Sequence, residues 1–306
     1  MMSSESTMRR TGRYRHVVFA DAIDGAGRAV NLAPVDGCEI EQSLEVDQAE
    51  FLGWLFGKAN IDVRQYRAET LARRLPACLR TLRASNVGAA RLAIGRNPGL
   101  LNDALNAMLI GVTEFFRDGA VFDELAQRVL PEMLHRTGGR LRVWSVGCSN
   151  GAELYSIAML LSELGVTEGV ELLGTDCRID ATGEAARGLY DSHNLIGVST
   201  ARLERHFQRV DEAGADQPVW RIKEPLRRMT HWRTADVMGT VEPGPWDLIL
   251  CRNAAMYFRP SAAAELWERL GNVMTRGGYL VLGKAERPSG APGLVSAGQY
   301  LYRRVD

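Results

Sequence analysis

The residues best suited to hold a nucleoside lie between 141 and 176. The apolar run LRVWSV predicts a buried strand, and it breaks at Gly147-Cys-Ser-Asn-Gly151 directly before a helical pattern. A strand that turns through glycines into a helix directs backbone N–H groups and a positive helix end toward one point, where a polar ligand can bind. About 25 residues later the strand VELLGTD ends in Asp176, the position at which nucleotide-binding folds hold the hydroxyls of a ribose. Ser149 replaces the middle glycine, so a tight turn without a ligand remains an alternative.

Composition restricts the classes of protein that this chain can belong to. The 306 residues are 46% hydrophobic and 24% charged, which is typical of a globular protein of one or two domains. Acidic and basic residues are equal at 37 each, so we expect neither nucleic acid nor an anionic membrane as the main partner. No apolar run approaches the ~20 residues that span a bilayer. Scattered cysteines and histidines predict a reducing cytoplasmic location and no metal site.

The elements that must position these residues follow a simple order. Residues 1–42 are polar, with a β-hairpin and partial disorder as alternatives, and residues 43–138 show helical patterns interrupted at Pro76. Glycines at 138–139 predict a linker, after which strands alternate with helices through residues 139–306. This rhythm stops at about 192–235, where a helix and two short strands predict an insertion. We therefore expect an α/β fold with a Rossmann-like parallel sheet, a small antiparallel insertion and an all-α N-terminal domain.

Six segments together resemble one family. They are VTEFFRD at 112–118, RVWSVGCSNGAELYSIAMLL at 142–161, LLGTD at 172–176, ARGLY at 186–190, DLILCRNAAMYF at 247–258 and RGGYLVLGKAE at 276–286. In this order they resemble the chemotaxis-type methyltransferases, the CheR family, which use S-adenosylmethionine to esterify glutamates of chemoreceptors. The resemblance implies a class I methyltransferase fold, S-adenosylmethionine as cofactor, S-adenosylhomocysteine as product and no metal.

The resemblance also implies roles for individual residues. Arg117 and Tyr257 match the active-site arginine and tyrosine of the family. The positions that correspond to the cofactor site are Thr113, Gly147, Ser149, Gly151, Glu153, Asp176, Asp236 and Asn253. An ionised carboxylate needs no base to accept a methyl group, so alignment, exclusion of water and control of charge are what the protein must supply.

Structural roles remain open for several of these residues. Thr113 could cap the following helix, Glu153 could favour a helix dipole, and Asp236 and Asn253 could serve in turns. The family's arginine-rich docking helix is represented by Arg73, Arg74 and Arg80, although Pro76-Ala-Cys interrupts the usual run of bases. Gly283-Lys-Ala-Glu286 also departs from the family's usual Gly-His-Ser-Glu.

These departures leave three functions open. The first is a protein-glutamate O-methyltransferase acting on chemoreceptors. The second is a related enzyme that methylates a small-molecule or carrier-bound acceptor in a biosynthetic pathway. The third is a cofactor-binding module without activity, which the presence of Arg117 and Tyr257 disfavours. In the first two, the partner is an acceptor that bears a carboxylate.

Overall fold

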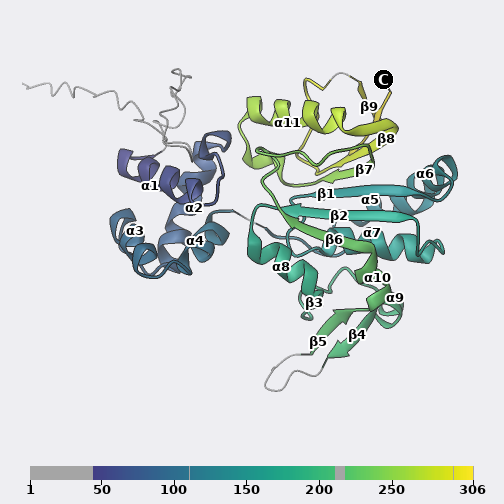
Figure 1. The fold of residues 1–306 in the computed structure, drawn as a ribbon, viewed down its shortest axis with the longest axis horizontal. Helices are drawn as coiled ribbons and strands as arrows, with labels where there is room; N and C mark the ends of the chain where they lie inside the picture. Colours follow the sequence, from purple (N-terminus) through teal and green to yellow (C-terminus); the bar gives the residue numbers. More distant parts are fainter. Residues whose placement is uncertain (1–43, 110, 211–217, 292, 306) are drawn as a thin grey trace, which may run out of the picture. The chain divides into compact units, whose positions relative to one another are not determined.

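The computed structural model describes residues 44–109, 111–210, 218–291 and 293–305. The hairpin or disorder expected for residues 1–42 lies outside this part of the chain. Figure 1 shows the fold, in which a helical segment precedes a mixed α/β region.

The N-terminal helical segment consists of short amphipathic elements. Its bounds are α1 Val46–Gly57, η1 Val63–Gln65, α2 Ala68–Thr81, α3 Val87–Arg96 and α4 Leu100–Met108. Helix α2 buries Leu71, Leu75 and Cys78 at helical spacing and exposes Pro76 on the opposite face. The predicted interruption at Pro76 is therefore wrong. A proline removes one intrahelical hydrogen bond, and the buried stripe on both sides of it holds the helix together.

The next helices pack with the sheet. They are α5 Gly119–Glu124, the π-helical η2 Leu125–Val129 and α6 Leu130–Thr137. Their buried side chains, such as Leu125 and Met133, share a hydrophobic cluster with Leu141 and Val143 of the first strand. The α1–α4 side chains belong to the other cluster, which also includes Trp144 and Val146 of the first strand. The helices α5, η2 and α6 therefore pack with the sheet, and the domain boundary expected at residues 138–139 stays a prediction.

The main sheet has seven strands in the order β6-β2-β1-β7-β8-β10-β9. Their bounds are β1 Leu141–Val146, β2 Val170–Asp176, β6 Thr230–Thr234, β7 Trp246–Cys251, β8 Met274–Leu282, β9 Leu294–Gly298 and β10 Leu301–Arg304. The first five strands of this order are parallel, and β10 pairs antiparallel with both β8 and β9. Strand order reverses between β1 and β7, and open α/β sheets bind ligands at the carboxyl end of such a switch point.

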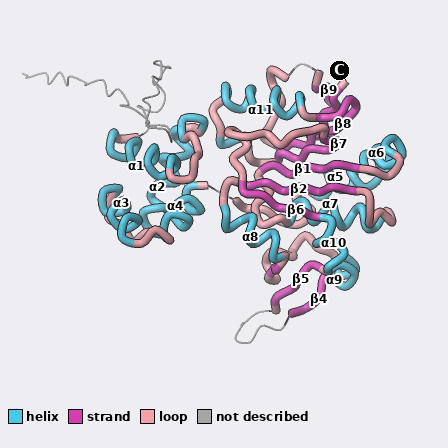
Figure 2. Tube along the Cα trace, in the orientation of Figure 1, coloured by secondary structure: helices cyan, strands magenta, loops and turns pink. Residues whose placement is uncertain are grey.

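Helices cover both faces of this sheet (Figures 1 and 2). In β1, Leu141 and Val143 point into one cluster with α7 (Ala152–Glu163), whereas Trp144 and Val146 point into the other with α11 (Pro260–Asn272). This alternation is what a strand buried on both faces requires. The helix α8 (Ile179–Arg187) connects β2 to the insertion.

The insertion is a three-stranded antiparallel sheet of order β3-β5-β4. It contains β3 Leu189–Tyr190, α9 Thr200–His206, β4 Phe207–Val210, β5 Val219–Ile222 and α10 Glu224–Met229. The predicted second strand of the insertion, at 230–234, is instead β6 of the main sheet, in parallel register with β2. An edge strand of five residues with an exposed His231 has the polar character expected of an insertion, which explains the error.

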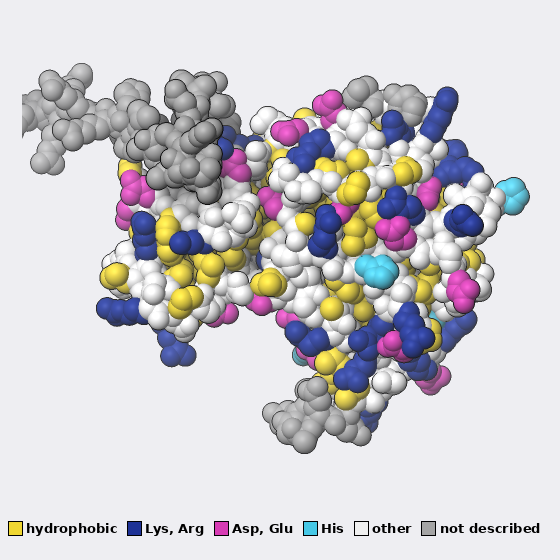
Figure 3. Space-filling view, viewed as in Figure 1, with side chains coloured by type: hydrophobic (Ala, Val, Ile, Leu, Met, Phe, Trp, Pro, Cys, Tyr) yellow, Lys and Arg dark blue, Asp and Glu magenta, His cyan; other side chains and the backbone are white. Residues whose placement is uncertain are grey.

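The charged side chains are unevenly distributed on the surface, although the net charge of the chain is zero. Figure 3 shows lysine and arginine side chains gathered over α10 and the insertion. Arg227 and Arg228 of α10 pair with Glu224 on the same helix. Across the part of the chain that the structure describes, no helix has the length and apolar character needed to cross a membrane.

Candidate active site

The loop after β1, residues 147–151, is a glycine-containing turn, which we call the glycine cradle. Gly147, Ser149 and Gly151 all adopt positive φ angles of 65°, 52° and 87°. Ser149 therefore has the left-handed backbone conformation that glycine favours, although it replaces the middle glycine of the motif. A Cβ on Gly151 would lie 2.6 Å from Cη2 of Trp232, so only glycine allows α7 to begin this close to β6.

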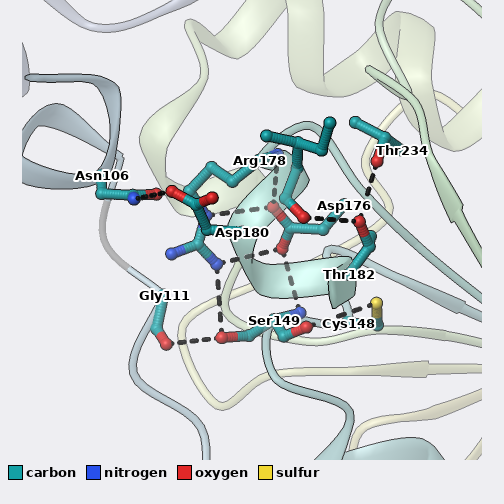
Figure 4. A network of polar contacts seen from close by, with 10 residues as sticks. Asn106, Gly111, Cys148, Ser149, Asp176, Arg178, Asp180, Thr182 and Thr234 are labelled. Carbon is teal, nitrogen blue, oxygen red and sulfur yellow. Dashed lines mark hydrogen bonds and ion pairs between the residues drawn. The ribbon is translucent and has the colours of Figure 1, made fainter. Parts of the chain in front are cut away.

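Asp176 ends β2 beside this loop, and its two carboxylate oxygens accept four hydrogen bonds (Figure 4). The backbone N–H of Ser149 donates to Oδ2 at 2.9 Å, and the backbone N–H of Arg178 donates to Oδ1 at 3.0 Å. The Arg178 side chain adds Nε to Oδ1 at 3.0 Å and Nη2 to Oδ2 at 3.1 Å. Although burial opposes it, the Asp176 charge raises the pKa of Arg178, which keeps the guanidinium charged.

The guanidinium of Arg178 also reaches the segment before Arg117. Its Nη2 donates to Oγ of Ser149 at 3.2 Å, and that hydroxyl donates to the carbonyl of Gly111 at 2.6 Å. A Cβ on Gly111 would lie 2.0 Å from Nη2, so the guanidinium fills the space that a side chain would occupy. The two side-chain donors of Arg178 thus engage both carboxylate oxygens of Asp176. The glycine cradle supplies backbone N–H groups and Asp176 supplies carboxylate oxygens, which is the donor and acceptor chemistry that an adenosyl group requires.

A second charged network lies around Glu153 in the first turn of α7. The buried Arg252, which follows β7, donates Nη1 to Glu153 Oε2 at 3.3 Å and Nη2 to Asp118 Oδ2 at 2.7 Å. Ser145 Oγ donates to Glu153 Oε1 at 2.9 Å. Burial raises the pKa of the Glu153 carboxyl, against the opposing charge of Arg252 and the hydrogen bond from Ser145.

Asp118 joins this network to the loop after β8. Nζ of Lys284 lies 2.6 Å from Asp118 Oδ1, so the lysine that departs from the family pattern has a partner. Burial alone would raise the pKa of Asp118, but the hydrogen bond from Lys284 and the charges of Arg252 and Lys284 hold it below its usual value.

Arg117 and Thr113 lie on the loop between α4 and α5. Nη1 of Arg117 donates to the carbonyl of Val112 at 3.0 Å, and the carbonyl of Arg117 accepts from Nη2 of Arg252 at 2.8 Å. Arg252 thus holds the backbone at Arg117 and the side chain of Glu153 together. Helix α5 begins at Gly119 with Asp118 as N-cap, so Thr113 does not cap it.

The remaining cofactor-site candidates follow the ends of β6 and β7. Asp236 Oδ1 accepts from the backbone N–H of Met238 at 3.1 Å, a turn-capping contact, and burial raises the pKa of its carboxyl. The backbone N–H of Ala235 donates to the carbonyl of Asp176 at 2.9 Å, which joins this turn to β2. Asn253 has a positive φ of 59°.

Hydrogen bonds to backbone groups hold the loop that carries Asn253 and Tyr257. Glu286 accepts hydrogen bonds from the N–H groups of Asn253, Ala255 and Met256. On the other side, the N–H of Arg67 donates to the carbonyl of Tyr257 at 3.0 Å.

The arginines of α2 do not join these networks. Arg73 and Arg80 are exposed, whereas Arg74 is half-buried. Nε and Nη2 of Arg74 donate to the carbonyl of Ala107 on α4, at 3.0 and 2.6 Å. Of the three, Arg74 therefore has a structural role inside the helical segment.

Sequence reasoning missed Arg178, Arg252 and Glu286. The signal for Arg252 was present, because an arginine directly after a buried strand requires carboxylate partners. Glu286 lies within a quoted motif, but four backbone donors leave no mark in a sequence. Arg178 is two residues from Asp176, a spacing that alone does not indicate a contact.

Comparison with known proteins identifies the family. Residues 111–298, more than half of the chain, match the family described as CheR methyltransferase, SAM binding domain. The chain belongs to the CheR methyltransferase family. Chemotaxis protein methyltransferase 1 of Pseudomonas aeruginosa is 34% identical over 63% of this chain and 72% of its own length. The chemotaxis protein methyltransferase of Listeria monocytogenes is 28% identical over 80% and 91%. A probable chemotaxis protein methyltransferase of Rhizobium etli is 29% identical over 77% and 90%.

The match confirms the resemblance given by the six segments. The chain is an S-adenosylmethionine-dependent methyltransferase with the expected α/β fold, helical N-terminal segment and antiparallel insertion. The family segment begins at residue 111, directly after the helical segment.

Proposed function

We propose that this enzyme is a protein-glutamate O-methyltransferase that acts on chemoreceptors and requires no metal. The observation that carries the proposal is the glycine cradle beside Asp176, at the switch point of the sheet, within the residues 111–298 that match the CheR family. Relatives named as chemotaxis protein methyltransferases support the choice of receptor.

The residues of the chain have separate tasks in this proposal. S-adenosylmethionine supplies a methyl group that is already activated on a positive sulfonium. Asp176 holds the ribose, and Glu153 holds the ammonium group of the amino-acid end. Arg117 orients the acceptor carboxylate with its planar, permanently charged fork. Tyr257 donates a hydrogen bond from its hydroxyl to the second carboxylate oxygen.

The acceptor is an ionised glutamate side chain, so no general base is required. The exposed Arg73 and Arg80 of α2 offer positive charge to an acidic receptor surface. This docking role belongs to the proposal, as does a cytoplasmic location of the enzyme.

The first test is calorimetric titration with S-adenosylhomocysteine. Wild-type protein is expected to bind, and Asp176→Asn is expected to bind at least about tenfold more weakly, because the amide offers one acceptor oxygen fewer. Absence of binding to the wild type contradicts the proposal.

The second test identifies the acceptor. Labelled S-adenosylmethionine is incubated with the enzyme and a membrane preparation of chemoreceptors, with and without EDTA. Methyl esters on receptor glutamates that are released in mild base are the expected product, unchanged by EDTA. Turnover of a small carboxylic acid without label on the receptor would favour the biosynthetic function instead.

A further inference from the structure

Glu286 lies where the loops after two neighbouring strands meet. Strands β7 and β8 run parallel with Cys251 opposite Leu282, so the residues that follow them emerge side by side at the carboxyl edge. The chain after β8 turns at Gly283, and the N–H of Glu286 donates back to the carbonyl of Gly283 at 3.1 Å. This turn directs the Glu286 side chain toward the loop after β7.

The carboxylate of Glu286 is buried, with 3% of the residue exposed, and accepts four hydrogen bonds from backbone N–H groups. Oε2 accepts from Asn253 and Gly283, each at 2.8 Å. Oε1 accepts from Ala255 at 2.8 Å and from Met256 at 3.2 Å. Both oxygens are thus engaged, and together they bind the loop after β7 at Asn253, Ala255 and Met256.

The close approach of these loops depends on Gly283. A Cβ at this position would lie 2.7 Å from Glu286 Oε2 and 2.8 Å from the backbone nitrogen of Asn253. The backbone of Asn253 has a positive φ. Tyr257 ends the short helix η3, Ala255–Tyr257, and the N–H groups of the first two residues of this helix both donate to Oε1 of Glu286.

We propose that Glu286 is a positioning residue, which holds the Asn253–Tyr257 loop in the conformation that methyl transfer requires. The inference rests on the proposed function, because it assigns Glu286 to the placement of Tyr257. A carboxylate is the side chain suited to this task, since its two oxygens can accept from four donors at once. A misplacement of about 1 Å in a catalytic group is enough to reduce a rate about a hundredfold.

Glu286→Gln is the decisive variant. The amide keeps the length of the side chain but offers only one acceptor oxygen and turns an N–H₂ group toward backbone donors. We expect kcat to fall about ten- to a hundredfold, with a smaller change in KM for S-adenosylmethionine. Amide proton resonances of either the Asn253–Gly283 pair or the Ala255–Met256 pair should move upfield in NMR spectra, because one pair loses its acceptor.

Asp247→Asn is the matched control. Asp247 is another buried acid, located at the opposite end of β7, where it accepts from the backbone N–H of Arg142 at 2.9 Å and from Thr275 Oγ1 at 3.1 Å. It should lower thermal stability and leave kcat near that of the wild type.

A double-mutant cycle with Tyr257→Phe separates positioning from general damage. If Glu286 acts through Tyr257, the two effects on kcat are not additive, and Glu286→Gln costs little once the hydroxyl is absent. Fully additive effects, or an unchanged kcat in Glu286→Gln, overturn the proposal. If Glu286→Gln does not fold, Glu286→Asp retains the charge with a shorter reach and enters the same cycle. A wild type that binds S-adenosylhomocysteine but transfers no methyl group to receptors contradicts the proposed function, whatever the variants do.

Discussion

Arginine side chains pair with the two acids that we propose for the cofactor site. Arg178 fills the acceptor positions of Asp176, and Arg252 pairs with Glu153. A buried charge without a partner is costly, so these arginines stabilise a site that carries several carboxylates. In the proposed site, the cofactor must therefore compete with contacts that Asp176 and Glu153 already make.

Arg178→Ala is expected to tighten the binding of S-adenosylhomocysteine. The variant leaves Asp176 with its two backbone donors and frees the positions that ribose hydroxyls would take. A gain of about tenfold corresponds to about 1.4 kcal/mol, within the range of a hydrogen bond to a charged group. Calorimetry measures the affinity, and Arg142→Ala, which removes a pair with Glu171 at the other end of the sheet, serves as control. Weaker binding in Arg178→Ala would instead make Arg178 part of the ligand site.

Arg117→Ala is expected to reduce kcat about 10²–10³-fold while the affinity for S-adenosylhomocysteine stays within about twofold. The reason is that Arg117 is assigned to the acceptor and not to the adenosyl group. Single-turnover transfer and calorimetry on the same preparation give both numbers. An equal loss of both would remove Arg117 from its proposed role.

For single residues, the sequence indicated which of them lie near the candidate site, but it did not indicate which of them contact each other. Asp176 and Ser149 were both expected at the site, and they share a hydrogen bond. Arg252 and Glu286 could not be assigned partners, because Arg252 lies 99 residues from Glu153 and Glu286 lies at least 30 residues from its donors in the Asn253–Tyr257 loop.

The elements around the site depend on a few close contacts. Gly151 allows the first turn of α7 to lie against Trp232 and Ala185, where a Cβ would approach to 2.6 and 2.8 Å. The periodicity of the sequence predicted this strand and this helix. It predicted a strand at the position of β6 but assigned that strand to the insertion, because a short edge strand with polar side chains has the pattern of a surface element.

Gly151→Ala is expected to lower the free energy of unfolding by about 1–3 kcal/mol, from overpacking and from a positive φ that alanine disfavours. Urea unfolding followed by circular dichroism measures the change. Gly183→Ala in α8 is the control, because its Cβ would meet nothing nearer than 3.6 Å. We expect this control to gain about 0.5–1 kcal/mol.

The helix α2 offers a test of receptor docking. The double variant Arg73→Ala, Arg80→Ala should raise KM for the receptor several-fold at low salt and leave thermal stability unchanged, since both side chains are exposed. Arg74→Ala should lower stability by about 0.5–1.5 kcal/mol, because it loses its bonds to the carbonyl of Ala107. An unchanged KM in the double variant would remove α2 from the docking surface.

Across the whole molecule, the helical segment reaches the catalytic region through specific polar contacts. Asn106 of α4 donates from Nδ2 to Asp180 Oδ2 of α8 at 2.8 Å (Figure 4). Composition and periodicity predicted the two kinds of structure, helical and α/β. The packing of α5 and α6 on the sheet could not be predicted, because their helical patterns do not differ from those of the helices before them.

A short antiparallel pairing joins residues nearly two hundred positions apart. Tyr66 and Phe258 form a bridge, Arg67 donates its N–H to the carbonyl of Tyr257, and Arg259 donates to that of Gln65. The amide hydrogens of Arg67 and Arg259 should therefore exchange with deuterium at one common rate, since neither can open without releasing the other. Each such opening would release the loop that carries Tyr257. The opening rate would therefore set how often the enzyme, without substrate, leaves the conformation required for methyl transfer.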